Sequence, residues 1–230
     1  ADDVASAFDH FSSLAAEAIV VIAPVDSLAE AVASQGASVP VVAVSGGRTF
    51  GRGVSVVHAD QRGGARALAE HLMSLGHRDI ACVAGPQEWF EARERVAGWR
   101  EAMDEAGLPK RAPLVGSWEA RWGYVAGQNL VEDGLPDAVM CANDEVAVGL
   151  LRAFAEAGVS VPGDVSVAGF DDVPMAAYAG PGLTTVRQDF ADLGRCALEA
   201  VSRALDGEAV DTFVRPTRLV VRGSTGVCAR

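Results

Sequence analysis

The chain has 230 residues, half of them hydrophobic, and 31 acidic residues against 19 basic ones give it a formal net charge of −12. This composition excludes a disordered or fibrous chain, and the length suits one large α/β domain or two lobes with their own cores. An acidic surface repels phosphate backbones, which argues against nucleic-acid binding by this chain alone. The longest apolar run, residues 18–23, is far shorter than the ~20 residues of a membrane-spanning helix.

Cysteine and histidine usage predicts no metal site, no cofactor and no disulfide framework. The sequence has no C-x-x-C pair and no histidine pair at ligand spacing. Its cysteines are widely spaced, and we expect reduced thiols at Cys82, Cys141, Cys196 and Cys228. The chain begins Ala-Asp-Asp without a basic or apolar stretch behind it, so no signal peptide is visible, and we expect a cytoplasmic location.

The chain opens on a predicted amphipathic helix, because Val4, Phe8, Phe11 and Ala15 share one helical face. After it, short β-branched runs alternate with segments of helical period, which is typical of parallel βαβ units. We expect strands at residues 19–22, 41–44, 54–57, 80–83, 139–141 and 165–167. Several of these runs are continuously apolar, as strands covered on both faces require.

Helix signals between the strands are clear. Asp60 can cap a helix that ends near Gly76, and Asn143 or Asp144 can cap one that ends near Gly158. After Leu183 the order changes. Residues 184–187 look extended, Asp189 or Asp192 opens a helix that runs to Gly207, and residues 218–222 form a last strand.

Polar side chains follow several of the predicted strands, at the ends where ligands bind in open parallel sheets. These side chains, at Ser45, Trp118, Asn143 and Asp171, offer a hydroxyl, an indole, an amide and a carboxylate. Together with Arg95 they form a plausible polyol site, because an arginine fork and a carboxylate bind vicinal hydroxyls while a flat ring packs on a sugar face.

Each of these residues also has a simpler interpretation. Asn143 could act only as a helix N-cap, and Asp171-Asp172 could form a turn before Val173-Pro174. Trp118 could belong to the core. Arg93 and Arg95 could lie on a solvated helix face.

No catalytic arrangement competes with a binding site, so we expect a protein that is not an enzyme. The sequence has no G-x-S-x-G elbow, no P-loop and no nucleophile–base pair that can be named. Gly51-Arg52-Gly53 has G-x-G spacing, but the stretch after it looks extended rather than helical, so a turn is expected there instead of a dinucleotide site.

Several segments, in this order, resemble the effector-binding core of the lactose-repressor/galactose-repressor transcription factors. They are DQRGGARALAEHLMSLGHRDIACVAG at 60–85, EARERVAGWREAM at 91–103, CANDEVAVGLLRAFAEAGVSVPGDVSVAGFDD at 141–172 and LTTVRQDFADLG at 183–194. The L-G-H-R, A-N-D, G-F-D-D and L-T-T-V-x-Q signals are jointly specific, and the resemblance covers nearly the whole chain.

The resemblance implies an α/β fold like that of type I periplasmic binding proteins, with two lobes, three crossovers and a ligand in the cleft. Each lobe would be a parallel sheet flanked by helices. The N-terminal lobe would hold residues 1–57 plus 190–211, and the C-terminal lobe residues 58–188 plus 213–230. The first strand and helix of the N-terminal lobe, a hinge and a helix-turn-helix would be missing, so the chain looks truncated.

The resemblance also implies which residues hold the effector. Arg95 matches an arginine that grips it, and Asp171 matches a carboxylate that binds hydroxyls. The other matched or neighbouring positions are Asn143, Trp118, Phe190, Gln188, Ser45, Trp89 and Phe90. Ser45 stands where many sugar-binding members carry aspartate, which puts a specific sugar assignment in doubt.

The expected partners are a small sugar-like or polyol effector and a second copy of the chain. Operator DNA would be bound only through the missing N-terminal domain, and effector binding would shift a two-state equilibrium that sets operator affinity. The alternative is a secreted sugar-binding protein of an ABC transporter, which has the same fold. The motif set favours the regulator.

Overall fold

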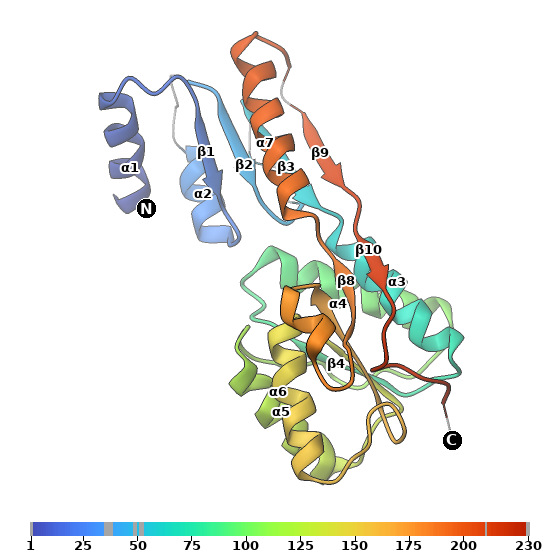
Figure 1. Ribbon diagram of the computed structural model, residues 1–230. Coiled ribbons are helices and arrows are strands. Elements are labelled where there is room, and N and C mark those ends of the chain that lie inside the picture. Colours follow the sequence, from blue (N-terminus) through green and yellow to red (C-terminus); the bar gives the residue numbers. More distant parts are fainter. Residues whose placement is uncertain (1, 35–38, 48–49, 51–52, 210, 229–230) are drawn as a thin grey trace. The chain divides into compact units, whose positions relative to one another are not determined.

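The chain folds into two units, each built around its own β-sheet, as the computed structural model in Figure 1 shows. The structure describes residues 2–34, 39–47, 50, 53–209 and 211–228. Unit 1 comprises residues 1–60, 88–91 and 189–216, and unit 2 comprises residues 61–87, 92–188 and 217–230. Gly51 and Arg52 of the expected turn lie outside the described residues.

The sheet of unit 1 has the order β1-β2-β3-β9, and each described pair of neighbours is parallel. Its strands are β1 (Ile19–Ile22), β2 (Val41–Val44), β3 (Val54–Ala59) and β9 (Thr212–Arg215). Valine and isoleucine dominate the first three strands, because branched side chains pack well on a pleated surface. The strand β2 is therefore central and buried, pairing with β1 on one side and β3 on the other.

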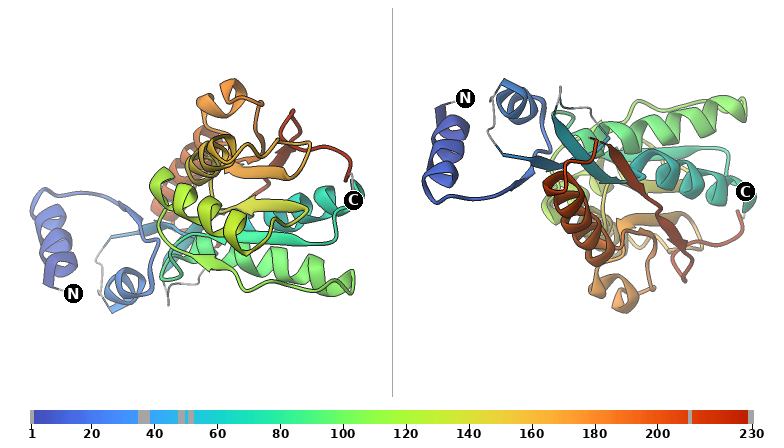
Figure 2. Two further views of the ribbon diagram at one scale, coloured as in Figure 1. Left: turned by 90° about the horizontal axis from the view of Figure 1, so that it is seen from below. Right: turned by 90° about the horizontal axis from the view of Figure 1, so that it is seen from above.

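Helices cover both faces of this sheet (Figure 2). The helix α7 (Phe190–Leu205) packs Cys196, Ala197 and Ala200 against Val42 and Val57. The helices α1 (Asp2–Ser13) and α2 (Asp26–Ser34) contribute to a second cluster that contains Phe8, Val32, Phe50 and Phe90. The predicted opening helix is thus confirmed as α1, although Phe11 remains 44% exposed.

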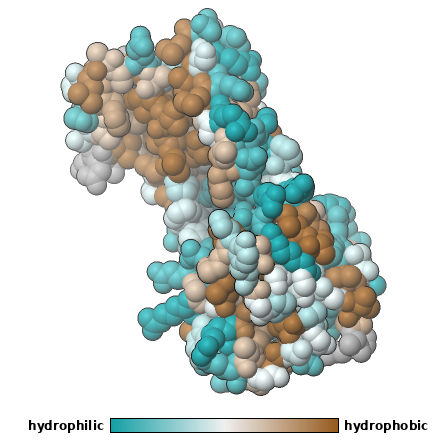
Figure 3. All heavy atoms as spheres, in the orientation of Figure 1, coloured by the Kyte–Doolittle hydropathy of each residue, from teal (hydrophilic) through white to brown (hydrophobic). Residues whose placement is uncertain are grey.

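The strand β1 is the described edge of this sheet and carries apolar side chains on its surface. Val20 is 47% exposed and Ile22 is 71% exposed. Figure 3 shows apolar residues gathered on this face of unit 1. The described residues therefore leave this edge uncovered.

The sheet of unit 2 has the order β10-β8-β7-β6-β4-β5, parallel except that β10 runs antiparallel to β8. Its strands are β4 (Ile80–Ala84), β5 (Leu114–Val115), β6 (Ala138–Cys141), β7 (Ser166–Asp171), β8 (Thr184–Arg187) and β10 (Arg218–Val220). The carboxyl ends of β4, β6, β7 and β8 all point the same way, so the residues after them meet at one edge.

Helices also flank this sheet on two sides, with one hydrophobic cluster on each face. One cluster packs α3 (Gln61–Ser74) and α4 (Phe90–Glu105) on the sheet, and the other packs α5 (Ala120–Asp133) and α6 (Asp144–Glu156). A short 3-10 helix, η1 (Pro174–Tyr178), follows β7. The expected caps are confirmed: Asn143 accepts from the Val146 N–H at 2.8 Å, and Asp189 accepts from the Asp192 N–H at 2.8 Å.

The expected fold class is confirmed, and two details at the end of the chain differ from expectation. The strand β9 was not predicted, and it pairs in parallel with β3. This pairing keeps residues 212–216 in unit 1, whereas we expected the return to the second lobe at residue 213. The last strand, β10, ends at Val220 rather than at residue 222.

No helix of the part that the structure describes is long and apolar enough to cross a membrane. The four cysteines are thiols rather than disulfides: Cys82, Cys141 and Cys196 are buried, and Cys228 is half-buried. Burial raises the pKa of Cys82 to about 12, because a thiolate loses its hydration in the core. Burial also raises the pKa of Cys141 and Cys196, so these three thiols behave as packing groups rather than nucleophiles.

Candidate functional site

Four side chains of unit 2 close a ring of hydrogen bonds at the carboxyl ends of its strands. Arg95 Nε donates to Gln61 Oε1 at 2.9 Å, and Gln61 Nε2 donates to Gln188 Oε1 at 2.7 Å. Gln188 Nε2 donates to Asp171 Oδ1 at 2.7 Å, and Arg95 Nη2 lies 3.1 Å from the same oxygen. Arg95 Nη1 also donates to the carbonyl oxygen of Ala142. The ring fixes the guanidinium and the carboxylate in one arrangement.

Aromatic rings pack on the guanidinium of Arg95. Its central carbon lies 3.9 Å from the ring centroid of Phe170 and 5.4 Å from that of Trp118. Such contacts are favourable, because the π face of a ring carries partial negative charge. Arg95 is only 5% exposed, so its positive charge lies inside the protein. The two aromatic rings, the carboxylate of Asp171 and the side-chain amide of Gln61 stabilise it there.

Asp171 is the member of the hydrogen-bonded ring that keeps an open acceptor. Its side chain is 21% exposed, and Oδ2 accepts no hydrogen bond from the residues that the structure describes. Burial raises the pKa of Asp171, and the positive charge of Arg95 opposes that rise. Its backbone has a φ of 107°, which a non-glycine residue rarely adopts. Strained backbone of this kind clusters at functional sites, and here it carries a carboxylate with one unused oxygen.

Asp172 has a different task from its neighbour Asp171. Its side chain is 3% exposed, and it accepts hydrogen bonds from Arg187 Nε at 2.5 Å and from Arg222 Nη2 at 2.6 Å. Hydrogen bonds from these two guanidinium groups, first from Arg222, lower its pKa against the opposing effect of burial. Asp172 therefore ties the turn after β7 to β8 and to the segment after β10.

Asn143 and Trp118 are linked by a hydrogen bond. Asn143 Nδ2 donates to the carbonyl oxygen of Trp118 at 3.0 Å, while Oδ1 caps α6. Asn143 is 8% exposed, and Trp118 is half-buried. The N-cap interpretation of Asn143 is thus confirmed, and the same amide also positions the loop that presents the indole ring.

The remaining candidates belong to unit 1, except Gln188, which closes the hydrogen-bonded ring. Ser45 is 3% exposed, and its hydroxyl donates to the carbonyl oxygen of Ala23 at 2.7 Å. Trp89 is half-buried and Phe190 is 57% exposed. Phe90 is 4% exposed and packs in the core cluster of unit 1, and its backbone N–H donates to the carbonyl oxygen of Pro24 at 2.8 Å.

Sequence patterns did not predict two residues that complete this site, Gln61 and Phe170. Gln61 is the first residue of α3 and 5% exposed, next to Asp60, which was expected to cap that helix. Its partner Gln188 is 127 residues away in sequence. Phe170 precedes Asp171 in a continuous apolar strand, so its sequence context indicates only core. No local signal identifies either residue.

A buried carboxylate, Asp144, lies directly beside Asn143. It is 1% exposed, Oδ2 accepts from the Val173 N–H at 2.8 Å, and Oδ1 accepts from Thr185 Oγ1 at 2.6 Å. Burial raises its pKa to about 6, from the 3.8 of an exposed aspartate. Hydrogen bonds from Thr185 and Val173 act in the opposite direction.

Replacing Asp144 with asparagine is expected to make stability less dependent on pH. The folded carboxyl holds its proton more tightly than the unfolded one, so its contribution to stability is fully present below pH 3.8 and is lost as the pH rises through about 6. A shift of this size corresponds to about 3 kcal/mol. Between pH 4 and pH 7.5, urea denaturation should show the stability of Asp144→Asn rising relative to the unchanged protein by about that amount. A pH-independent difference would contradict this.

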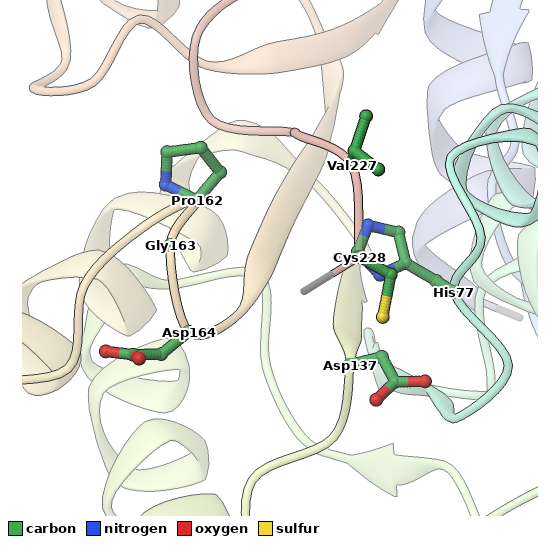
Figure 4. Close-up of a pocket in the computed structure, with 7 residues that line it drawn as sticks. All are labelled: His77, Asp137, Pro162, Gly163, Asp164, Val227 and Cys228. Atoms are coloured by element: carbon green, nitrogen blue, oxygen red, sulfur yellow. The ribbon is translucent and has the colours of Figure 1, made fainter. Parts of the chain in front are cut away.

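A cavity of about 240 Å³ lies at the opposite edge of the same sheet (Figure 4). It is lined by His77, Asp137, Pro162, Gly163, Asp164, Val227 and Cys228. These residues precede the strands of unit 2 or belong to its C-terminal segment, and His77 Nε2 bonds the carbonyl oxygen of Gly226 at 3.0 Å. The cavity is therefore separate from the Arg95–Asp171 ring.

The described residues include no group of three or more histidine, cysteine, aspartate or glutamate side chains that could hold a metal ion. The chemistry of the Arg95–Asp171 ring is that of recognition. It combines one fixed guanidinium, one carboxylate with an open oxygen and a half-buried indole, which suits a neutral ligand with several hydroxyl groups.

Comparison with known proteins agrees with the α/β fold of the chain. Residues 69–225 match the family model described as a periplasmic binding protein-like domain. The chain is 37% identical over 164 residues to the lactose operon repressor of Escherichia coli (strain K12), an alignment that covers 70% of this chain and 46% of that protein. The chain thus spans about half the length of the curated relatives it matches.

Solved structures show the same similarity. The lac repressor dimer bound to operator and the anti-inducer ONPF superposes with a TM-score of 0.86 and 30% identity, covering 96% of this chain and 78% of that one. A complex of the transcriptional regulator CelR with cellobiose superposes with a TM-score of 0.85 and 30% identity, covering 96% of this chain and 69% of that one.

Proposed function

We propose that this chain, which belongs to the periplasmic binding protein-like domains of the lactose-repressor/galactose-repressor regulators, binds a small sugar-like effector. The proposed site is the hydrogen-bonded ring of Arg95 and Asp171. The relatives of this chain are transcription regulators rather than enzymes. The single observation that carries the proposal is the open Oδ2 of Asp171, whose other oxygen pairs with Arg95, the guanidinium that lies over the Trp118 ring.

In the proposed complex, a ligand hydroxyl donates to Asp171 Oδ2, and the C–H face of the sugar packs on Trp118. Gln188 and Gln61 complete the hydrogen-bonded ring and hold Asp171 and Arg95 in position. Asn143 supports the Trp118 loop. Ser45, Trp89, Phe90 and Phe190 stay predictions as further ligand contacts.

The regulatory output is proposed from the relatives. The lac repressor structure contains a dimer on its operator. We propose that this chain also works as a homodimer and that operator DNA is bound by a helix-turn-helix outside these 230 residues. The net charge of −12 supports a division of labour in which this part does not bind DNA itself.

Asp171→Asn is expected to weaken effector binding by about 10- to 100-fold, because a hydrogen bond to a charged group is worth ~1.5–3 kcal/mol. The measurement is a thermal-shift screen with monosaccharides, cellobiose and other disaccharides, sugar phosphates, polyols and nucleosides. A ligand at a hundred times its dissociation constant adds about 2.7 kcal/mol to the stability of the folded state.

The matched control is Asp133→Asn, the same change at an exposed carboxylate near the end of α5. It should leave the ligand-induced shift intact. A ligand that stabilises Asp171→Asn as well as the unchanged protein would contradict the proposed site, and a panel without any hit would contradict the proposed ligand class.

A further inference from the structure

Asp144 connects three parts of unit 2 with one buried side chain. It opens α6, its Oδ2 accepts from the Val173 N–H in the turn after β7, and its Oδ1 accepts from the Thr185 hydroxyl on β8. These two hydrogen bonds are 2.8 and 2.6 Å long. Both are shielded from solvent, because Asp144 is 1% exposed and Thr185 is fully buried.

The turn that Asp144 holds contains unusual backbone. Asp171 has a φ of 107° and Asp172 a φ of 55°, so two successive non-glycine residues adopt a region that favours glycine. Such backbone persists only when its surroundings over-determine it. The Val173 N–H follows these two residues directly, and Asp144 therefore fixes the end of the strained pair.

The space for this carboxylate is built into the neighbouring strand. Gly169 lies on β7, and a Cβ atom there would collide with Asp144 Oδ1 and lie 3.3 Å from Asp144 Cα. Leu183 closes the same space, with its Cδ2 at 3.0 Å from that Cβ position. The glycine thus lets a charged group sit flat against an otherwise apolar strand.

We propose that Asp144 is a positioning residue of the effector site: by holding Val173 and Thr185 it keeps the turn after β7 in the conformation that points Asp171 at Arg95. The part of this inference that concerns ligand affinity rests on the proposed function. The part that concerns the turn does not.

The charge state of Asp144 should control the turn. The titratable groups that face it are Asp171 and Asp172 in the turn and the Cys141 thiol at the end of β6, and burial keeps that thiol protonated by raising its pKa. Asp171 is paired with Arg95, and Asp172 with Arg187 and Arg222. Burial outweighs the two hydrogen bonds in setting the pKa of Asp144, so the closed turn favours the protonated carboxyl over the carboxylate.

The experiment is amide hydrogen exchange of the unliganded chain, followed residue by residue by NMR at pH 5 and pH 7.5 and corrected for intrinsic exchange. In the unchanged protein, protection of the Val173 amide should rise by about tenfold at the lower pH, because the buried carboxyl of Asp144 holds its proton more tightly than the carboxyl that opening of the turn exposes. In Asp144→Asn, protection should be the same at both pH values. In Asp144→Ala it should be low at both.

Two further variants keep the test decisive. If Asp144→Ala does not fold, Thr185→Val removes one of the two anchors and should lower protection of Val173, whereas Thr185→Ser keeps the hydroxyl and should not. The matched control is Asp164→Asn, because Asp164 Oδ2 accepts from the Ser160 N–H at 2.8 Å in a different turn. That change should leave Val173 unaffected.

Equal protection of Val173 in all variants and at both pH values would overturn the role of Asp144. Affinity for cellobiose, or for a sugar that the panel identifies, should fall at least tenfold in Thr185→Val and stay unchanged in Thr185→Ser. Equal affinity in both would overturn the link to the ligand. A protected, pH-dependent Val173 in a chain that binds none of the sugars would instead refute the proposed function and leave the turn mechanism supported.

Discussion

Replacing Arg95 with alanine is expected to lower the free energy of unfolding by about 3–5 kcal/mol, because it leaves a buried charge without its partner. The change removes the donors to Gln61 Oε1, to the Ala142 carbonyl oxygen and to Asp171 Oδ1. It also opens a space beneath the ring of Phe170. Urea denaturation followed by tryptophan fluorescence measures this directly, since Trp99, Trp118 and Trp122 all lie in unit 2.

The loss should shrink at low pH. Arg95 opposes the rise that burial imposes on the pKa of Asp171, so without Arg95 this pKa rises further and the carboxyl takes up a proton as the pH falls. Arg152→Ala is the control: Arg152 makes an exposed pair with Glu156, whose loss should cost less than ~1 kcal/mol. A loss at Arg95 as small as this would show that the hydrogen-bonded ring contributes nothing to stability.

Strong local patterns predicted most of the fold. The β-branched runs at 19–22, 41–44 and 184–187 coincide with β1, β2 and β8. Capping residues likewise predicted the starts of α6 and α7, because each side chain satisfies an N–H of its own helix. Elements that form from local contacts within one stretch of sequence could therefore be predicted from the sequence.

Structure that depends on distant partners was not predicted. The strand β9 is short and only partly buried, and it exists because it pairs with β3, which precedes it by about 150 residues. Gln61 joins the site through Gln188 in the same way. Phe90 also depends on tertiary packing: its ring lies in the core cluster of unit 1, which the sequence around it did not indicate.

The candidate site was predicted in part. The strand-end pattern and side-chain chemistry pointed to Arg95 and Asp171, the resemblance to known regulators implied their roles, and the structure joins them at 3.1 Å. Neither the sequence pattern nor the resemblance predicted the deep burial of Arg95. Because Arg95 is buried and hydrogen-bonded to several partners, its removal also affects stability, so Asp171→Asn is the cleaner test of the proposed binding.

Gly149→Ala is expected to destabilise the chain by about 3 kcal/mol, at the upper end of the usual cost of overpacking. The helices α5 and α6 touch backbone to backbone at this point. A Cβ at Gly149 would overlap the carbonyl oxygen of Ala120 and lie 2.9 Å from the backbone nitrogen of Tyr124, and a Cβ at Gly123 would overlap the Val146 carbonyl oxygen. Because backbone atoms cannot rotate away as side chains do, α6 must move.

Movement of α6 should also reach the site, since Asn143 and Asp144 stand at its first turn. Urea denaturation measures the stability loss, and NMR exchange at Val173 reports the displacement of Asp144. Gly194→Ala is the matched control, because Gly194 lies in α7 with no atom near its Cβ position, and the same substitution there should stabilise the helix by ~0.5–1 kcal/mol. If both alanines stabilise, the close contact of α5 and α6 is not rigid, and the position of Asp144 must be fixed by its hydrogen bonds alone.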